Sequence, residues 1–235
     1  MACWQTGMMD YVLQELAFPK DLAGQTVLVT AGATQEPMDP VRYITNHSTG
    51  KMGYAIAQNA ARRGASVTLI SGKTTLPVPR FVQQFVPIVT AEELHQAVVQ
   101  HAAQCDLVIM SAAVADYRPT VIQTEKIKKH DTVSTLSLER TTDILAELGQ
   151  NKRPGQYLCG FSMETESLLE NSRKKLEQKN LDLIVANNLK QPGAGFAIDT
   201  NLVTLLTKEE TVSLPLLSKE AVAEQLLTFI QNHRA

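Results

Sequence analysis

The chain has 235 residues, enough for one α/β domain with a large core or for two small domains. Its net charge of −2 and pI near 6.2 argue against a general nucleic-acid-binding surface, so any polyanion site must come from a local basic cluster. Apolar runs fall short of a membrane span, and no basic segment followed by an apolar one opens the chain, which favours a cytoplasmic protein without a membrane segment.

The three cysteines, Cys3, Cys105 and Cys159, do not have the spacing of metal ligands. Cys105 and Cys159 lie in or beside apolar strand-like runs, which predicts buried thiols. This usage suits a reducing compartment.

The elements that the sequence predicts begin after an N-terminal extension or remnant, residues 1–21, in which 9–16 form a helical turn or two. Residues 22–235 are expected to form a single domain. Strand-like runs cover 26–30, 66–71, 81–89, 106–113, 157–161 and 181–186. Helix-like runs between them cover 50–63, 90–104, 142–149 and 165–179. Such alternation predicts an α/β fold with a Rossmann-like, doubly wound, mostly parallel sheet covered on both faces.

The C-terminal part of the chain differs from this alternation. Runs 202–207 and 211–216 flank the charged residues 208–210, which predicts an antiparallel hairpin at a sheet edge. Residues 218–233 form an amphipathic helix. Segment 116–140 is a long insertion, expected to form a flap, between a central strand and a helix. It would lie outside the carboxyl ends of the strands, where open α/β sheets bind ligands.

Residues 39–53, between the first strand and the first helix, are the first candidate site. Ser48, Thr49 and Gly50 are good helix-start residues, and a helix N-terminus attracts anions. Donors just before it, Arg42, Asn46 and His47, could add to an anion site. The alternative is an ordinary loop and helix cap, and the spacing favours the anion site over it.

A nicotinamide-dependent oxidoreductase on the same fold is disfavoured. The loop after the first strand, 31–37, has Gly32 but lacks the further glycines of the dinucleotide fingerprint, and the second strand ends without an acidic residue. Gly50-Lys51 does not form a P-loop, because Met52 stands where that motif has Ser or Thr.

Other candidate residues are basic or small. The cluster Lys126-Ile127-Lys128-Lys129 lies within the insertion and is either a solvated turn or part of an anion site. Lys175 and Lys179 are four residues apart on one predicted helix face. Residues 112–115 are small and end a strand, so a flat ligand could lie against the backbone there. Asp116 could accept a hydrogen bond from a base or sugar, or cap a turn.

Taken together, these stretches resemble the phosphopantothenate–cysteine ligase family (phosphopantothenoylcysteine synthetase) of coenzyme A biosynthesis. The match spans roughly residues 25–230 in the expected order, through 30–44, 46–53, 112–117, 126–129, 160–161, 164–165 and 179–187. The resemblance identifies residues 22–235 as a single ligase domain. So many linked motifs make the match specific.

The resemblance implies a reaction of the bacterial, CTP-dependent type. CTP activates the carboxylate of 4′-phosphopantothenate as an acyl-cytidylate and pyrophosphate leaves. The amine of L-cysteine then attacks, which gives 4′-phosphopantothenoylcysteine and CMP. The family requires Mg²⁺, whose ligands the sequence does not identify, and it is a homodimer whose active sites draw on both subunits.

The resemblance also assigns roles by position. Asn46 and Lys126 match the catalytic residues, and the amide of Asn46 would donate to the acyl oxygen. Substrate-binding positions are Arg42, Asn46 and Ala113. The nucleotide-binding positions are Asp116, Lys126, Thr142, Asp143, Ile144, Leu145, Phe161, Lys175 and Lys179. Thr142 stands where the family usually has Pro, which leaves the start of that helix open.

Many bacterial ligases follow a flavin-dependent decarboxylase in one chain. Residues Met1-Ala2-Cys3 are similar to the end of that half, but Trp4 replaces the expected glycine. This stretch is a remnant, a fragment boundary or a coincidence. Because the chain has too few residues for an additional flavin domain, we expect no decarboxylase activity from it, and a flavin-dependent decarboxylase half or partner is one candidate partner. A non-catalytic ligase-like module is a further alternative, and the presence of Asn46, Lys126 and Asp116 argues against it.

Overall fold

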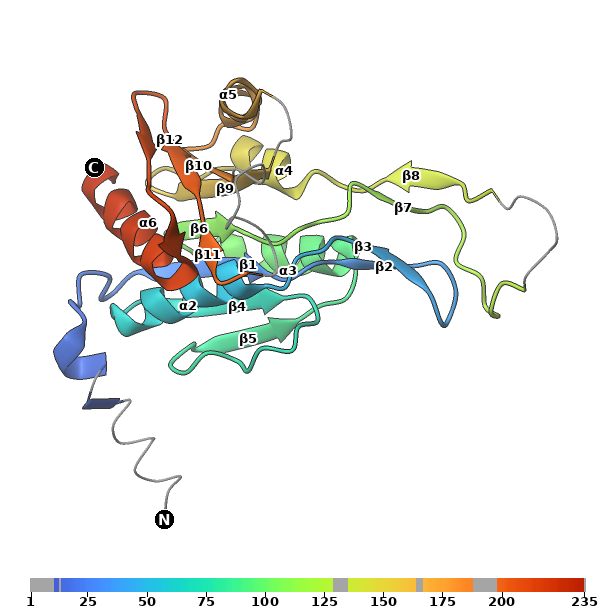
Figure 1. Ribbon diagram of the computed structural model, residues 1–235, viewed down its shortest axis with the longest axis horizontal. Coiled ribbons are helices and arrows are strands. Elements are labelled where there is room, and N and C mark those ends of the chain that lie inside the picture. The colour runs from blue at the N-terminus through green and yellow to red at the C-terminus, as the bar shows by residue number, and fades with distance from the viewer. Residues whose placement is uncertain (1–10, 13, 129–134, 164–166, 188–197, 235) are drawn as a thin grey trace, which may run out of the picture.

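The computed structural model describes residues 11, 12, 14–128, 135–163, 167–187 and 198–234, and it is built around a sheet of eight strands. The strand order is β13-β12-β10-β9-β6-β1-β4-β5, and the six strands from β10 to β5 are parallel (Figure 1). Their bounds are β1 Thr26–Ala31, β4 Ser66–Ser71, β5 Gln84–Pro87, β6 Leu107–Met110, β9 Tyr157–Met163 and β10 Leu183–Asn187. The antiparallel edge consists of β12 Val203–Leu206 and β13 Thr211–Ser213.

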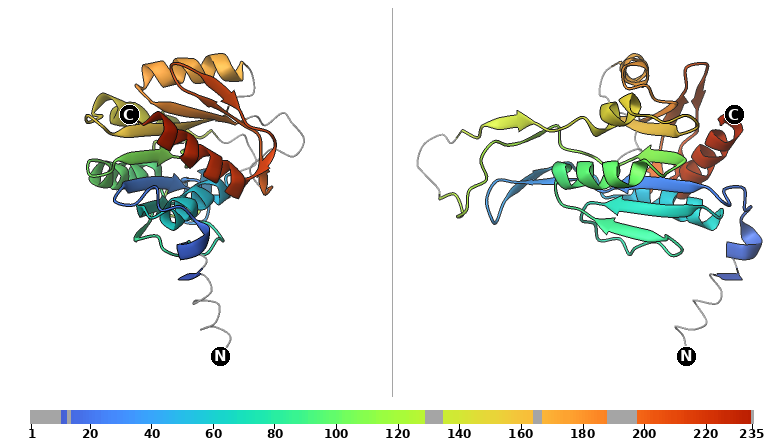
Figure 2. Two further views of the ribbon diagram at one scale, coloured as in Figure 1. Left: turned by 90° about the vertical axis from the view of Figure 1, so that its left-hand side faces the viewer. Right: turned by 180° about the vertical axis from the view of Figure 1, so that it is seen from behind.

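Helices cover both faces of the sheet because the parallel strands are apolar on both sides. In β1, Val27 and Val29 pack in one core cluster with α2 (Lys51–Arg62) and α6 (Lys219–His233). Leu28 packs in a second cluster with α3 (Ala91–Ala102), α4 (Ile144–Gln150) and α5 (Leu168–Gln178). Opposite views show the two layers (Figures 1 and 2). The prediction of a Rossmann-like, mostly parallel sheet with an antiparallel edge hairpin is confirmed.

The predicted elements have somewhat different bounds in the structure. The predicted strand 81–89 shortens to β5, and Phe81 has a positive φ of 68°. The predicted helix 142–149 begins only at Ile144, because Asp143 is its N-cap and accepts from the Ala146 amide. The free thiols of Cys105 and Cys159 are buried, as predicted, and burial raises the pKa of Cys105 to about 11.

Two hairpins form an arm that extends from the sheet, and the sequence predicted only the second of them, as a flap (Figure 1). One joins β2 (Gln35–Pro37) to β3 (Tyr43–Thr45), and the other joins β7 (Tyr117–Pro119) to β8 (Leu138–Arg140). The predicted flap is the β7–β8 hairpin and the segment between its strands. A further short pair, β11 (Thr200–Asn201) and β14 (Leu217–Ser218), was also missed.

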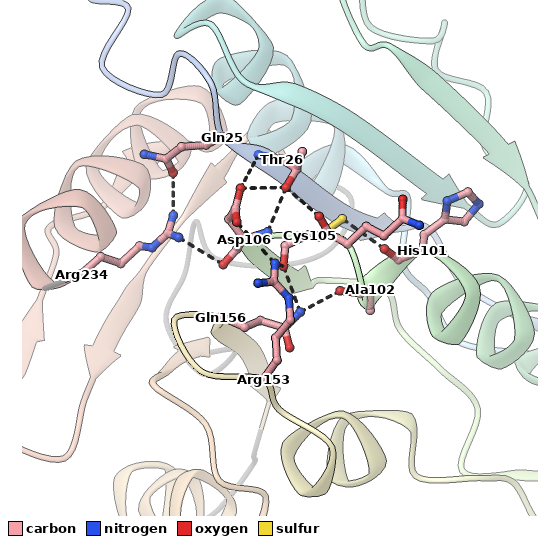
Figure 3. A network of polar contacts seen from close by, with 10 residues as sticks. Gln25, Thr26, His101, Ala102, Cys105, Asp106, Arg153, Gln156 and Arg234 are labelled. Atoms are coloured by element: carbon pink, nitrogen blue, oxygen red, sulfur yellow. Dashed lines mark hydrogen bonds and ion pairs between the residues drawn. The ribbon is translucent and has the colours of Figure 1, made fainter.

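A polar network connects the amino ends of β1 and β6 to Arg234, near the C-terminus (Figure 3). Its centre is Asp106, whose carboxylate accepts from the Thr26 amide at 2.9 Å and the Thr26 hydroxyl at 2.8 Å. Arg153 donates to the same carboxylate at 3.3 Å, and Arg234 donates to the Asp106 carbonyl. The hydrogen bonds from Thr26, with Arg153 adding to them, hold the pKa of Asp106 below its usual range.

We expect Asp106→Asn to lower the free energy of unfolding at pH 7 by about 1–2 kcal/mol, because it weakens hydrogen bonds to a charged acceptor that is partly exposed and therefore screened. Because the folded-state pKa is lowered, the carboxylate stabilises the protein above the ordinary value of 3.8 and loses this effect as the pH falls through the folded pKa. Urea unfolding at pH 7 and at pH 3 should therefore give a difference between the two proteins that shrinks at the lower pH. A pH-independent difference would contradict the assignment.

Candidate active site

Two adjoining pockets lie beyond the carboxyl ends of β6, β9 and β10. The α2 pocket, of about 320 Å³, is lined by the first turn of α2, residues 111–114, the ends of β9 and β10, and Lys219. The α4 pocket, of about 510 Å³, is lined by residues 140–145 with Lys175 and Lys179. Ala112, Val114, Asp116 and Phe161 line both pockets and so form their common wall. Volumes of this size suit small molecules, and the end of a parallel sheet is a usual place for them.

Most of the common wall belongs to the small-residue segment after β6. Two threonine hydroxyls accept hydrogen bonds from the backbone of this segment. The Thr30 hydroxyl accepts from the Ala112 amide at 3.1 Å, and the Thr34 hydroxyl accepts from the Ala115 amide at 3.0 Å. Ala113 pairs with Ala33 in a parallel bridge. The predicted small-residue floor is therefore present, with Ala113 in the α2 pocket and Asp116 in both pockets.

The N-terminus of α2 enters the α2 pocket. Its N-cap is Gly50, one of the three predicted start residues, which has a φ of 80° and no side-chain capping bond, while the Ser48 hydroxyl accepts from the Gly50 amide at 3.4 Å. A left-handed conformation of this kind favours glycine. At Gly53 a Cβ would lie 2.6 Å from the Ala31 Cβ, so glycine lets the first turn approach the end of β1.

Two lysines make the α2 end of this pocket positive. Lys51 pairs with Asp199 at 2.6 Å, and this pairing lowers the pKa of Asp199. Lys219 is buried and donates to the Ile198 carbonyl at 2.6 Å. Burial lowers the pKa of Lys219, and the nearby charge of Lys51 adds to the effect. A bound anion would stabilise the charged forms of both lysines. The positive end of the α2 dipole would also attract the anion.

Asn46 lines the α2 pocket, and its side chain contacts the common wall. The amide nitrogen donates to the carbonyl of Ala113 at 3.3 Å and to that of Val114 at 3.1 Å. An amide nitrogen has two N–H donors, so these bonds use both. The donor predicted for an acyl oxygen is therefore engaged here, and the amide oxygen is left to meet a ligand.

Two polar oxygens at the far wall of the α2 pocket are buried without a hydrogen-bond partner. They are the Ser162 hydroxyl, at the end of β9, and the Asn187 amide oxygen, at the end of β10. A buried unpaired oxygen is costly, and such groups concentrate at functional positions. Both residues mark this wall as a polar contact surface that the sequence prediction did not include.

The α4 pocket brings together most of the predicted nucleotide-binding residues. Thr142, Asp143, Ile144, Leu145, Phe161, Lys175 and Lys179 line it together with Asp116. Lys179 pairs with Asp143 at 2.8 Å, and Lys175 lies one turn before Lys179. Ile144 is buried in the core, and its amide donates to the Thr142 carbonyl at 3.1 Å.

Close packing fixes Lys179 against α4. A Cβ at Gly149 would lie 1.8 Å from the Lys179 carbonyl oxygen, so only glycine permits this approach. Asn180 follows in a left-handed conformation and donates to the Gly149 carbonyl at 2.9 Å. The prediction that Lys175 and Lys179 share one face agrees with their common pocket.

Arg42 and Lys126 lie on the arm, and neither is among the residues that line the two pockets. Arg42 pairs with Asp39 and donates to the Ile127 carbonyl at 2.9 Å. Lys126 is exposed, in the segment between β7 and β8 that lies away from the sheet (Figure 1). Within one chain the structure does not bring them to Asn46. Lys129, Glu164 and Thr165 of the resemblance, and Cys3, lie outside the described residues.

Within the described residues, three or more His, Cys, Asp or Glu side chains do not gather in a group that could hold a metal ion. Asp116, in the common wall, is a carboxylate that lines both pockets. The described part of the chain likewise has no helix long and apolar enough to cross a membrane.

Lys219 is the clearest residue that sequence reasoning missed. It is the first residue of α6, after the N-cap Ser218, where a positive charge is unfavourable for the helix dipole. A lysine at this position therefore indicates a function other than stabilising the helix. Ser162 and Asn187 gave no such signal, because each reads as an ordinary strand end.

Comparison with known proteins supports one family. Residues 22–233 match the family described as DNA/pantothenate metabolism flavoprotein C-terminal domain. The coenzyme A biosynthesis bifunctional protein CoaBC of Bacillus subtilis (strain 168) is 48% identical over 207 residues, which are 88% of this chain and 51% of that protein. CoaBC of Escherichia coli (strain K12) is 44% identical over 223 residues, 94% of this chain and 55% of that protein.

The chain thus spans about half the length of the curated relatives it matches. A crystal structure of the C-terminal domain of CoaBC superposes with a TM-score of 0.78 at 42% identity, covering 91% of this chain and 97% of the other. The sequence match, the shared fold and the two pockets agree, and the chain belongs to the DNA/pantothenate metabolism flavoprotein C-terminal domain family.

Proposed function

We propose that the protein is a phosphopantothenate–cysteine ligase of coenzyme A biosynthesis, acting through an acyl-cytidylate. CTP and 4′-phosphopantothenate form the intermediate with loss of pyrophosphate, and L-cysteine then displaces CMP. The observation that carries the proposal is the common wall of two pockets, each with its own basic group. One anionic substrate can lie on each side of this wall, and the two can react at its edge.

The nucleotide occupies the α4 pocket. Asp116 and residues 142–145 contact the base and ribose, Phe161 packs against them, and Lys175 and Lys179 face the phosphates. Phosphopantothenate occupies the α2 pocket, with its phosphate toward Lys51, Lys219 and the α2 N-terminus. Its carboxylate end then lies toward Asn46 and Ala113.

Magnesium would enter with the nucleotide, and it would neutralise part of the charge of the triphosphate. The lysines of the α4 pocket hold the remaining charge of the nucleotide.

The active unit is a homodimer formed through the arm. Seven large apolar side chains there are exposed: Val41, Tyr43, Tyr117, Val121, Ile122, Leu136 and Leu138. A concentration of this kind on one projection indicates a covered surface. In the dimer the arm brings Arg42 and Lys126 to the partner's pockets, which accounts for their distance from Asn46 within one chain.

The ligase acts in the cytoplasm, next to a flavin-dependent decarboxylase that is either a half of the same polypeptide or a separate partner. Such an enzyme would consume the ligase product. The protein binds small molecules, and its net charge of −2 disfavours nucleic-acid partners.

The nucleotide specificity is a first test. Ala112 and Val114 of the small-residue floor line the proposed nucleotide pocket, and a base whose polar edge does not match such a pocket leaves buried groups unpaired. We expect kcat/KM for CTP to exceed that for ATP by on the order of a hundredfold. Pyrophosphate release with phosphopantothenate and each nucleotide, at equal concentrations, measures this. Comparable turnover with ATP would reject the specificity.

The same assay tests the function itself. Without cysteine, pyrophosphate should appear up to about one equivalent per site, and with cysteine it should turn over. If no pyrophosphate is released with or without cysteine, the result favours the alternative of a non-catalytic module. A fluorescence change on addition of NADPH would point to the oxidoreductase alternative.

A further inference from the structure

Asp39, at the tip of the β2–β3 hairpin, is the centre of a clamp that joins the two hairpins of the arm. It is 3% exposed although the arm extends from the sheet. Its Oδ1 accepts from the Val41 and Arg42 amides, both at 2.8 Å, which closes the hairpin tip. Its Oδ2 accepts from the Arg42 side chain at 3.0 Å and from the Ile127 amide at 3.1 Å.

The clamp forms hydrogen bonds to both the amide N–H and the carbonyl of Ile127. Asp39 takes the amide N–H, and Arg42, held by Asp39, donates to the carbonyl at 2.9 Å. A second attachment lies just upstream, where the Gln123 amide donates to the Met38 carbonyl at 3.0 Å. Lys126 therefore lies on a short bridge between two fixed points, while its own side chain is exposed.

The negative charge of Asp39 strengthens the hydrogen bonds of this clamp. Hydrogen bonds to an ionised acceptor are stronger than neutral ones. The Arg42 guanidinium and the surrounding amides hold the pKa of Asp39 well below its usual range, so the carboxylate is ionised throughout the neutral range. By contrast, the arm residues belong to neither apolar core cluster. The clamp thus fixes a local segment without contributing to the core.

From this geometry we infer that Asp39 is a positioning residue for the ligase reaction: with Arg42 it fixes the segment that carries Lys126 so that the lysine is presented to the active site. The inference rests on the proposed function. It extends that function by giving a role to Asp39 and a second role to Arg42. The ordering is completed before substrate arrives, which avoids an entropic cost during the reaction.

The test compares Asp39→Asn with Glu139→Gln. Both remove a carboxylate from an arginine pair on the same arm, since Glu139 accepts from Arg118 at 2.8 Å, but Glu139 does not contact 126–127. We expect Asp39→Asn to slow acyl-cytidylate formation by about tenfold with smaller changes in both KM values. Glu139→Gln should keep the wild-type rate. Hydrogen exchange at the Ile127 amide should accelerate only in Asp39→Asn.

The decisive measurement is the double variant Asp39→Asn with Lys126→Gln. If Asp39 acts through Lys126, the double variant reacts as slowly as Lys126→Gln alone. Multiplied losses, or equal losses in Asp39→Asn and Glu139→Gln, would overturn the inference. Thermal unfolding and size-exclusion chromatography confirm that each variant is folded and keeps its oligomeric state. Absence of pyrophosphate release by the wild-type protein would instead reject the proposed function.

Discussion

Lys126→Gln is expected to slow acyl-cytidylate formation by on the order of a hundredfold or more, in line with the loss of other groups that stabilise transition-state charge. As the carboxylate attacks the α-phosphorus, charge moves onto the leaving pyrophosphate. An exposed lysine on the arm can neutralise that charge when the arm meets the nucleotide, and glutamine cannot. Rapid-quench detection of the intermediate in the absence of cysteine measures the step directly.

The control for this prediction is Lys128→Gln, which removes a neighbouring exposed charge from the same segment. It should have a much smaller effect, because a charge two residues away does not occupy the same position. If both variants behave alike, the segment contributes only general electrostatic attraction. If Lys126→Gln forms the intermediate at the wild-type rate, Lys126 is a surface charge with no part in the reaction.

The position of Lys126 adds a second test, of the proposed dimer. Lys126 and Asn46 are apart within one chain, so a lysine from one subunit would complete the site of the other. A hybrid dimer of Lys126→Gln and Asn46→Asp then contains one site with both native residues. Mixing and refolding the two variants together should restore activity that neither has alone. No restoration, with hybrid dimers present, would contradict a shared site.

The central fold was predictable because buried parallel strands carry a strong signal. Residues 107–110 are apolar on both faces, and the helices around them show a clear periodicity and caps such as Thr90, which accepts from the Glu93 amide. The arm was not predictable for the opposite reason. Its strands have only three residues each, which is too short for an apolar alternation to mark them.

The residues that line the α4 pocket were named by the family resemblance, and the structure brings most of them together in one pocket. The remainder of the site depends on long-range geometry. The polar wall at Ser162 and Asn187 and the buried Lys219 arise only when β9, β10 and α6 meet beside α2. The same holds for Asp39, whose partner Ile127 is 88 residues away.

Asn46→Asp is expected to separate the two half-reactions. In the folded site the Asn46 amide nitrogen donates to the Ala113 and Val114 carbonyls, which leaves the amide oxygen as the group of Asn46 that can accept a hydrogen bond in the α2 pocket. That oxygen can accept a hydrogen from the cysteine amine as it attacks the acyl group. It is neutral, so it orients the amine without favouring the protonated, unreactive ammonium form.

An aspartate at this position changes both contacts. One carboxylate oxygen would face two carbonyl oxygens that now receive a donor, and the charge would hold cysteine as an ammonium ion. The carboxylate would also repel negative charge that develops on the acyl oxygen as the amine attacks. Activation by CTP uses the nucleotide contacts of the α4 pocket, and Asn46 is not among the residues that line that pocket.

The variant should therefore consume one equivalent of CTP per site, accumulate the acyl-cytidylate and then react with cysteine on the order of a hundredfold more slowly than the wild type. Mass spectrometry after incubation with CTP and phosphopantothenate, before and after cysteine is added, detects the trapped intermediate. Asn46→Ala separates charge from anchoring, since it removes the donor bonds without adding repulsion and should impair the second step less. A purely structural Asn46 would instead lower binding of both substrates with no trapped intermediate, and conversion at the wild-type rate would reject a catalytic role altogether.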